Sequence, residues 1–472
     1  MKRKAISRIA LWTIIAVVIV VAVVGGVAAW YVTRPPAPPP APATINIGFT
    51  APITGSVATF GEVDPWLVPY IQNYINQNMG GIYIAQYGRK IPVNIIMKDD
   101  ESTPSVTSTV ATQLITQDHV VMLVAMHTPA STVPAAAVAE KYGVPCLCVE
   151  TPTDGWISAE PTGGYHWSYL VGQSFAQFAE KYVQIANEAR SEHPGQVNNV
   201  VAVIGTSDTD GELTVHLLDE MLSANGYQVV DLGVFAPGTT DFTSAILKAK
   251  AANATILMGN MVPPDFATFW KQAHELGWVP KVVAMGRAYL FRSNIESMGD
   301  NLGYGLATEM WWYPTLNYTS PLLGINTLQW TQMYESVTGH EWNSAIGYDL
   351  AAFEMMTQVL ENAGSLSPQA INQSLATLDM NTIMGPVKMG SVPPDVRQLY
   401  AQYEPSMLEP QNLGHYACLS VMEGQWVPGG PYGWTIVPVI SSGYPVQTYP
   451  VVLIPQNPAN ATPPYQPPYF AP

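Results

Sequence analysis

Hydrophobic positions between residues 45 and 310 follow two alternating patterns. Short apolar runs, as in buried strands, are followed by stretches in which apolar residues recur every three or four positions, as in amphipathic helices. The runs expected to be strands are 45–49, 93–97, 120–124, 145–149, 200–204, 229–235, 255–258 and 282–284. Strands that alternate with helices predict parallel sheets with right-handed crossovers. Because the rhythm restarts near residue 170, we expect an α/β protein with two doubly wound parallel-sheet lobes and a cleft between them.

The N-terminal segment has a different pattern. Basic residues crowd positions 1–8, and positions 9–33 carry no charged residue. Such a run is long enough to cross a bilayer, and a backbone in lipid must form a helix. The basic start predicts a cytosolic N-terminus and an extracellular body at the cell membrane. Small residues at 25–29 leave a cleavable secretory signal open as the alternative to a single-pass anchor.

Three further features fit an exported chain. The tripeptide Lys4-Ala5-Ile6 resembles an archaeal pilin-type processing site, so an archaeal source is expected. Residues 34–44 are rich in Pro, which favours an extended spacer between membrane and body. N-glycosylation sequons begin at Asn253, Asn317, Asn372 and Asn460.

Composition narrows the function. The 472 residues hold 19 Lys plus Arg against 35 Asp plus Glu, a net charge of −16, which argues against a nucleic-acid partner. Three Cys do not support a disulfide framework, and Cys146 and Cys148 are expected to be buried on one face of a strand. No nucleophile elbow, phosphate-binding loop or zinc-protease motif is present, so we expect no enzyme, no cofactor and no metal site.

A series of short motifs resembles the extracellular solute-binding proteins of branched-chain amino acid ABC importers, the leucine/isoleucine/valine-binding family. Each motif is weak alone, but their order along residues 45–390 is specific. They are Ile47-Gly48-Phe49-Thr50-Ala51-Pro52-Ile53-Thr54-Gly55, Val57-Ala58-Thr59-Phe60-Gly61-Glu62, Asn78-Met79-Gly80-Gly81-Ile82, Gly88-Arg89-Lys90-Ile91, Lys98-Asp99-Asp100-Glu101-Ser102, Ala139-Glu140-Lys141-Tyr142-Gly143-Val144-Pro145, Asp241-Phe242-Thr243, Gln272-Ala273, Leu276-Gly277 and Thr382-Ile383-Met384-Gly385-Pro386-Val387.

This resemblance implies a type I periplasmic-binding-protein fold whose two lobes are joined by three crossovers. It implies capture of a small-molecule ligand (an amino acid, amide, short peptide or organic acid) and delivery to an ABC permease with ATPase subunits. An extracellular sensor or a surface-layer-associated binding protein without a transport role stays open as the alternative.

Eight segments are expected. They are a cytosolic basic start at 1–8, an anchor or signal at 9–33, a spacer at 34–44, the first lobe at 45–168, the second lobe at 169–310, the first lobe continued at 311–380, the second lobe continued at 381–430, and a Pro/Tyr-rich tail at 431–472. The tail is expected to fray, or to extend along the surface or bind a partner.

In the first lobe, the resemblance places ligand contacts in two loops that follow strands. Phe60 would cover the ligand, unless it is a core aromatic residue. The loop with His127, Thr128, Ala130 and Ser131 would offer hydroxyls and backbone amides, although His127 could be packed and Ser131 could cap the next helix. The following loop offers hydroxyls at Thr151 and Thr153, and its Glu150 could pair with a cationic group or with Arg287 across the cleft.

The second lobe departs from the family pattern. The acidic residue that pairs with an amino acid's ammonium would fall near Ala288, which cannot do so. Asp210 could replace it, or Arg287, next to Tyr289, could bind an anion and change the ligand class. Both charged side chains could instead face outward.

Overall fold

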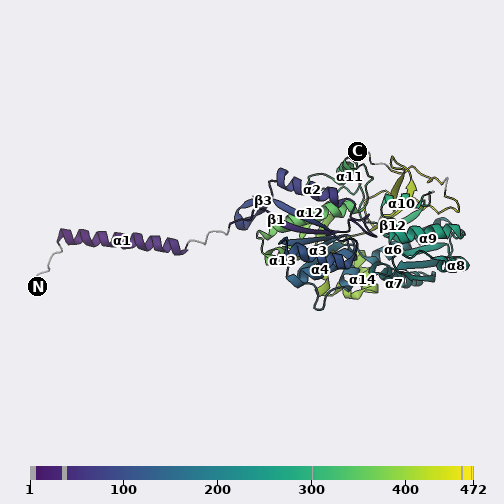
Figure 1. The fold of residues 1–472 in the computed structure, drawn as a ribbon, viewed down its shortest axis with the longest axis horizontal. Helices are drawn as coiled ribbons and strands as arrows, with labels where there is room; N and C mark the ends of the chain where they lie inside the picture. The colour runs from purple at the N-terminus through teal and green to yellow at the C-terminus, as the bar shows by residue number, and fades with distance from the viewer. Residues whose placement is uncertain (1–6, 34–39, 300, 459–460, 469, 471–472) are drawn as a thin grey trace. The chain divides into compact units, whose positions relative to one another are not determined.

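The computed structural model describes residues 7–33, 40–299, 301–458, 461–468 and 470, and the chain divides into two compact units, Met1–Ala41 and Pro42–Pro472 (Figure 1). The first unit contains α1 (Arg8–Thr33). Its segment Arg8–Gly26 has a mean hydropathy of 2.8. Among the described residues, this is the one helical segment that is long and apolar enough to cross a membrane. The expected processing site at 4–6 and most of the spacer lie outside the described residues.

The first lobe is built on a six-stranded sheet in the order β15-β7-β6-β5-β1-β4, in which every pairing is parallel. Its strands are β1 (Ile45–Ala51), β4 (Val93–Asp99), β5 (Met122–Met126), β6 (Cys146–Val149), β7 (Ser168–Gly172) and β15 (Tyr416–Cys418). β5 and β6 are buried along their whole length and β1 is buried except at Asn46, as expected when helices cover both faces of a parallel sheet.

Helices and short elements complete this lobe. They are α2 (Asp64–Asn73), α3 (Pro104–Thr116), α4 (Pro129–Tyr142), α5 (Thr153–Ser158), α11 (Thr327–Thr338), α12 (Ala345–Ala363), α13 (Pro368–Ala376), α14 (Pro394–Tyr403), α15 (Pro410–Leu413), the turns η1 (Tyr74–Asn78), η2 (Ala85–Tyr87) and η3 (Pro405–Leu408), and the hairpins β2 (Ile82–Ile84) with β3 (Arg89–Ile91) and β13 (Asp379–Thr382) with β14 (Gly385–Lys388). Several begin with Pro in the first helical turn, where its fixed φ suits the helix and its missing N–H costs nothing.

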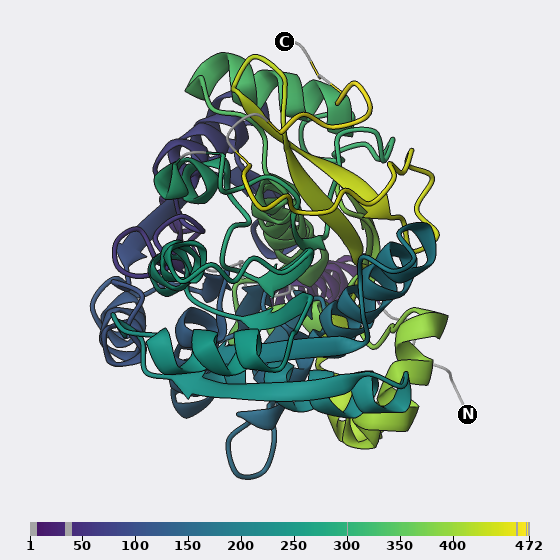
Figure 2. The ribbon, with the colours of Figure 1, turned by 90° about the vertical axis from the view of Figure 1, so that its right-hand side faces the viewer.

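The second lobe contains a seven-stranded sheet in the order β17-β16-β12-β11-β10-β8-β9. Its strands are β8 (Val200–Thr206), β9 (Gln228–Phe235), β10 (Ile256–Asn260), β11 (Val282–Gly286), β12 (Leu306–Met310), β16 (Met422–Pro428) and β17 (Trp434–Ile440), and its helices are α6 (Phe175–Glu192), α7 (Thr209–Ala224), α8 (Thr243–Ala251), α9 (Pro263–Glu275) and α10 (Arg292–Met298). β16 and β17 join antiparallel at one edge and are the yellow arrows in Figure 2.

The chain passes between the two sheets three times: after β7, after β12, and between β15 and β16. At the first passage Asp154 of α5 accepts hydrogen bonds from the Ser174 hydroxyl (2.8 Å) and from the N–H groups of Phe175 and Ala176 at the start of α6 (3.1 and 3.2 Å). A carboxylate at a helix N-terminus is favoured by the helix dipole, so Asp154 fixes this connection.

The structure differs from the expected segments near the C-terminus. β15 belongs to the first sheet, although 381–430 was expected in the second lobe. Within the expected tail, β17 pairs with β16, and Val451, Val452 and Ile454 are buried. The hydrophobic pattern could not reveal this, because Pro and Gly interrupt the segment and because a strand at the edge of a sheet depends on a distant partner.

The cysteines lie as expected. Cys146 and Cys148 are buried on one face of β6 with their sulfurs 3.7 Å apart, and both are free thiols. Of the sequons, Asn253 and Asn317 are exposed, whereas the Asn372 amide donates to the His166 carbonyl; Asn460 lies outside the described residues.

Buried carboxyl groups predict a stability that falls with rising pH. Burial raises the pKa of Glu341 and of Glu354 from 4.5 to about 8. The folded chain therefore keeps protons that the unfolded chain releases, so this contribution is complete below pH 4.5 and is lost as the pH rises through 8. We expect the melting temperature of the full chain to fall by a few degrees between pH 5 and pH 8.5.

Calorimetry of the variant Glu354→Gln tests the cause. The amide keeps an oxygen for the Ile383 N–H, which Glu354 now accepts at 2.9 Å, but it does not ionise. Between pH 5 and pH 8.5, the melting temperature of the variant should fall less than that of the parent chain. An unchanged pH dependence would show that Glu354 is ionised or solvated in the folded protein.

Candidate functional site

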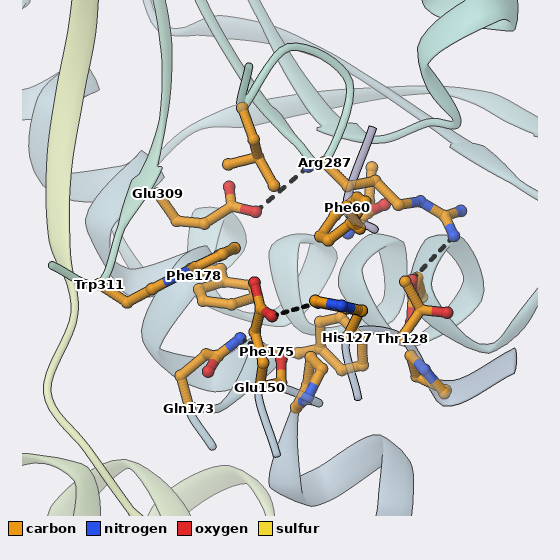
Figure 3. Close-up of a pocket in the computed structure, with 15 residues that line it drawn as sticks. Phe60, His127, Thr128, Glu150, Gln173, Phe175, Phe178, Arg287, Glu309 and Trp311 are labelled. Carbon is orange, nitrogen blue, oxygen red and sulfur yellow. Dashed lines mark hydrogen bonds and ion pairs between the residues drawn. The ribbon is translucent and has the colours of Figure 1, made fainter. Parts of the chain in front are cut away.

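A pocket lies where the carboxyl ends of strands from both sheets meet. Open α/β sheets bind ligands at this edge, because the loops that follow the strands converge there. The first lobe and its exit contribute Phe60, His127, Thr128, Pro129, Glu150, Pro152 and Gln173, and the second lobe contributes Phe175, Phe178, Asp210, Asn260, Arg287, Leu290, Glu309 and Trp311 (Figure 3).

The free space is divided between two adjoining cavities. The inner one leaves about 20 Å³ free, which is room for about one water molecule. The outer one has a volume of about 330 Å³ and shares Thr128, Pro129, Asp210 and Arg287 with it. Both lobes line both cavities, so their volume depends on the separation of the lobes.

Three ionisable residues stand directly after strands in an unusual backbone conformation. His127 follows β5, Glu150 follows β6 and Arg287 follows β11, with φ angles of 86°, 72° and 48°. Side chains other than glycine rarely adopt positive φ, and such strain occurs most often at functional sites. Main-chain hydrogen bonds hold the backbone in this conformation. The His127 N–H donates to the Val149 carbonyl (3.0 Å) and the Glu150 N–H donates to the Val171 carbonyl (2.8 Å).

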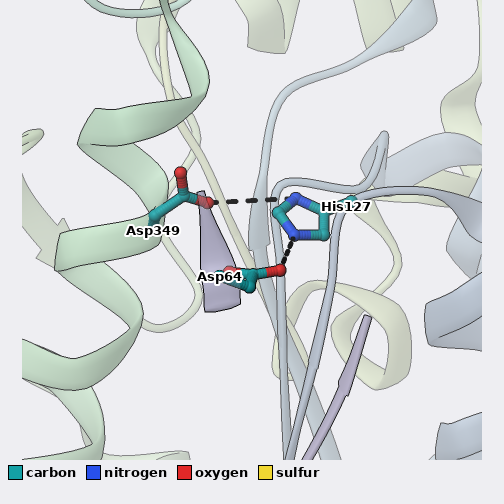
Figure 4. A group of neighbouring side chains, drawn as sticks. All are labelled: Asp64, His127 and Asp349. Atoms are coloured by element: carbon teal, nitrogen blue, oxygen red, sulfur yellow. Dashed lines mark hydrogen bonds and ion pairs between the residues drawn. The ribbon is translucent and has the colours of Figure 1, made fainter. Parts of the chain in front are cut away.

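His127 lies at the centre of a fully buried charge cluster in the first lobe. Its Nδ1 is 2.6 Å from Glu150 Oε2 (Figure 3). Its Nε2 is 3.0 Å from Asp64 Oδ2, and Asp349 Oδ1 lies 3.9 Å from Nδ1 (Figure 4). Burial alone lowers the His127 pKa, but the Glu150 and Asp64 carboxylates outweigh it and hold the pKa well above its usual value. Burial raises the pKa of Glu150 to about 7 and that of Asp349 well above 3.8.

Arg287 is the centre of a matching cluster in the second lobe. Its Nη2 donates to both oxygens of Asp208 (2.7 Å each), its Nη1 donates to Asp210 (2.8 Å), and its backbone N–H donates to Glu309 (3.1 Å). Tyr182 donates to the other Glu309 oxygen at 2.5 Å. Burial raises the Asp210 pKa to about 7 although Arg287 opposes this. The guanidinium is therefore already paired within its own lobe.

Comparison with known proteins identifies the family. A family model described as a periplasmic binding protein matches residues 44–398. The chain belongs to the periplasmic binding protein family. Its members bind solutes and are not enzymes, as the sequence predicted.

Individual relatives of this periplasmic binding protein are distant. The Leu/Ile/Val-binding protein homolog 7 of Brucella abortus (strain 2308) is 22% identical over 358 residues, which cover 74% of this chain and 85% of that protein. The crystal structure of the leucine binding protein LivK from Thermotoga maritima MSB8 matches with a TM-score of 0.65 and 17% identity, covering 84% of this chain and 99% of the other.

A second structure widens the ligand range of the fold. The solute binding protein of an ABC transporter from Rhodopseudomonas palustris BisB5, in complex with 3,4-dihydroxy benzoic acid, matches with a TM-score of 0.61 and 17% identity over 86% of this chain and 99% of that one. These likenesses confirm the type I fold. The relatives named here are bacterial and lend no support to the expected archaeal source.

The structure brings most of the expected site residues of this periplasmic binding protein together. Phe60, His127, Thr128, Glu150, Asp210 and Arg287 line the inner pocket, and Ala130 lines the outer cavity. Glu150 pairs with His127 and not with Arg287, and neither Asp210 nor Arg287 faces outward.

Four expected residues lie outside both cavities and are buried in the lobes. Thr151 bonds the Thr132 hydroxyl (2.8 Å), Thr153 bonds the Tyr400 hydroxyl (2.5 Å), and Tyr289 donates to the Ala307 carbonyl (2.8 Å). Ser131 is the third residue of α4 and does not cap that helix, whose N-cap is Thr128. The hydroxyls of Thr151 and Thr153 were a weak signal for ligand contact because both find partners within the first lobe.

Sequence reasoning missed residues of two kinds. Asn260 and Gln173 follow or end strands, so the strand-end rule could have found them. Asp64 and Asp349 lie in the helices α2 and α12, and Glu309 lies in β12, a strand that the pattern did not predict. No local signal in the sequence marks these three residues as part of the site.

Removal of the Arg287 charge should destabilise the second lobe. The variant Arg287→Met leaves Asp208 and Asp210 without their cation, and breaking one partner of a buried pair costs about 3 kcal/mol or more. Denaturant unfolding should show this loss, and adding Asp210→Asn should recover part of it. A loss below about 1 kcal/mol would mean that water replaces the ion pair.

Proposed function

We propose that this protein is a membrane-tethered, extracytoplasmic receptor that captures a small polar solute between its lobes and delivers it to an ABC permease. The family supports solute binding, and the position of the pocket between two sheets supports capture by closure. A ligand that contacts both lobes stabilises the closed form by its differential affinity.

The solute we propose carries an amine or amide group. The observation behind this is that buried oxygens on opposite walls of the pocket have no hydrogen-bond donor: Glu150 Oε1 and Gln173 Oε1 on one side, and Asp210 Oδ1 and Asn260 Oδ1 on the other. The Thr128 hydroxyl, also unpaired, is a candidate donor to an oxygen of the same solute. Two carboxylates occupy the Nη1 and Nη2 atoms of Arg287 and leave only its Nε–H without a partner, so an organic acid alone fits less well.

Aromatic and apolar side chains line the rest of the pocket. Phe60 packs edge-on against Phe291 with ring centroids 5.0 Å apart, and Phe175 and Phe178 line the opposite lobe. Ligand pockets combine such walls with a few polar groups that fix orientation. The solute is therefore expected to be small, with a polar head and a compact apolar part.

A thermal-shift screen of the full chain in detergent tests the solute class. Amines, amides, amino acids and short peptides should raise the melting temperature, and simple organic acids should not. Binding adds about 2.7 kcal/mol of stability at a hundredfold excess over Kd. If only organic acids bind, the proposed class is wrong.

The variant Asp210→Asn tests the proposed contact. Hydrogen bonds to a charged group contribute about 1.5–3 kcal/mol, so we expect a roughly 10- to 150-fold weaker affinity for an amine-bearing solute found in the screen. Asp265→Asn is the matched control: Asp265 is buried in the same lobe, accepts from Gly238 N–H and lines neither cavity. If calorimetry finds the same solute affinity for both variants, Asp210 does not contact the solute.

The tether can be tested separately. If α1 is a retained anchor, the chain extracted from membranes should keep residue 9 and all that follows, as read by N-terminal sequencing or intact mass. Removing residues 1–34 should give a protein that leaves the membrane fraction with unchanged solute affinity. A mature N-terminus near residues 25–29 would show a cleaved signal.

A further inference from the structure

The buried cluster around His127 has a chemistry that solute binding does not use. Asp64 is the first residue of α2, His127 follows β5, and Asp349 lies in the first turns of α12. Each offers one ligand atom, and these atoms lie within 4.8 Å of one another (Figure 4). All three side chains are fully buried.

The cluster has more carboxyl groups than cationic groups. Three carboxyl groups, those of Asp64, Glu150 and Asp349, surround one imidazole, and within the described residues their ion pairs all go to His127. Neither oxygen of Asp349 has a hydrogen-bond donor, and neither does Asp64 Oδ1. A buried carboxylate without partners costs several kcal/mol, so such a group calls for a cation or a proton.

We propose that Asp64, His127 and Asp349 bind one divalent transition-metal ion, such as Zn²⁺ or Mn²⁺. His127 binds through Nε2, and Glu150 accepts the N–H of Nδ1, across the 2.6 Å that already separates them. A carboxylate on the second nitrogen of a metal-binding histidine fixes the ring and strengthens the ligand. An imidazole with two carboxylates suits these ions better than Mg²⁺ or Ca²⁺, which prefer oxygen ligands alone.

The spacing is compatible with one ion. Ligands about 2 Å from a shared metal lie roughly 3–4 Å apart. Asp64 Oδ2 and His127 Nε2 are 3.0 Å apart, and one ligand atom from each of the three residues lies within 4.8 Å of the others. Asp349 Oδ1 lies 3.9 Å from Nδ1, so its side chain must shift toward Nε2 to share the ion. When the ion binds, the proton on Nε2 leaves and the positive charge offsets the carboxylates.

The ion would lie behind the pocket and would not bind the solute. Asp64 and Asp349 line neither cavity, whereas His127 and Glu150 line the inner one. A metal would hold the His127 ring and, through it, Glu150, and would leave Glu150 Oε1, which has no partner, available to the solute. The proposal therefore does not depend on the identity of the solute.

Metal binding can be measured on the full chain, purified in detergent without a histidine tag and stripped with EDTA. After dialysis against Zn²⁺ or Mn²⁺, elemental analysis should find one equivalent per chain, and Co²⁺ should give visible absorption bands of a bound ion. Mg²⁺ and Ca²⁺ should bind at least tenfold more weakly. A wild-type chain that retains no metal, or whose melting temperature no ion raises, would overturn the proposal.

Matched variants locate the site. Asp349→Asn and His127→Gln should lose the bound equivalent, and Glu150→Gln should weaken binding about 10- to 100-fold. Glu354→Gln is the control, because Glu354 is a buried carboxyl on the same helix and is outside the cluster. Wild-type affinity in Asp349→Asn, or loss in the control, would contradict the assignment.

Stability distinguishes a ligand from a structural residue. In EDTA, Asp349→Asn should melt higher than the wild type because it lacks an unpaired buried carboxyl, yet metal should no longer raise its melting temperature. A variant that melts lower in EDTA and still gains from metal would show that Asp349 supports the fold only. If Asp349→Asn does not fold, the Co²⁺ spectrum of His127→Gln tests the site instead: the absorption bands of the bound ion should be lost, and their retention would contradict the assignment.

Discussion

Burial of ionisable side chains at the ends of parallel strands is the constraint from which the site follows. A charge removed from water must be paired where it lies. The first lobe surrounds His127 with carboxyl groups, and the second surrounds Arg287 with Asp208 and Asp210. The positive φ angles at both centres show that the backbone bends to place these groups at the cleft.

The ion pairs of each lobe form within that lobe, and this bears on the proposed closure. Among the ion pairs of the described residues, none joins the two lobes. The lobes can therefore separate without exposing half of a buried pair, while the Asp154 contacts keep one connection in place. In the proposed carrier, closure would depend on what a bound solute adds across the gap.

The sequence supports the α/β architecture because strands and helices leave local periodic patterns, and the family resemblance led to the loops that hold His127, Glu150 and Arg287. The residues that pair with them could not be predicted from the sequence. Asp349 lies in α12, which comes much later in the chain than His127, so no spacing rule connects the two residues. The edge strand β17 was missed for the same reason, since its partner β16 and not its own composition defines it.

The electrostatics of the cleft also bear on what it can hold. Around the pocket, each lobe sets one cationic group against at least two carboxyl groups, and the chain carries a net charge of −16. Such a field raises the local concentration of cationic solutes and repels anionic ones. Ala288 is buried at the position where the family resemblance implies an acid. Asp210 brings a carboxylate to the same pocket from α7, so it is the proposed partner for an ammonium group. In the proposed function Asp210 takes the role of that acid, and Arg287, which pairs with both Asp208 and Asp210, would position the Asp210 carboxylate.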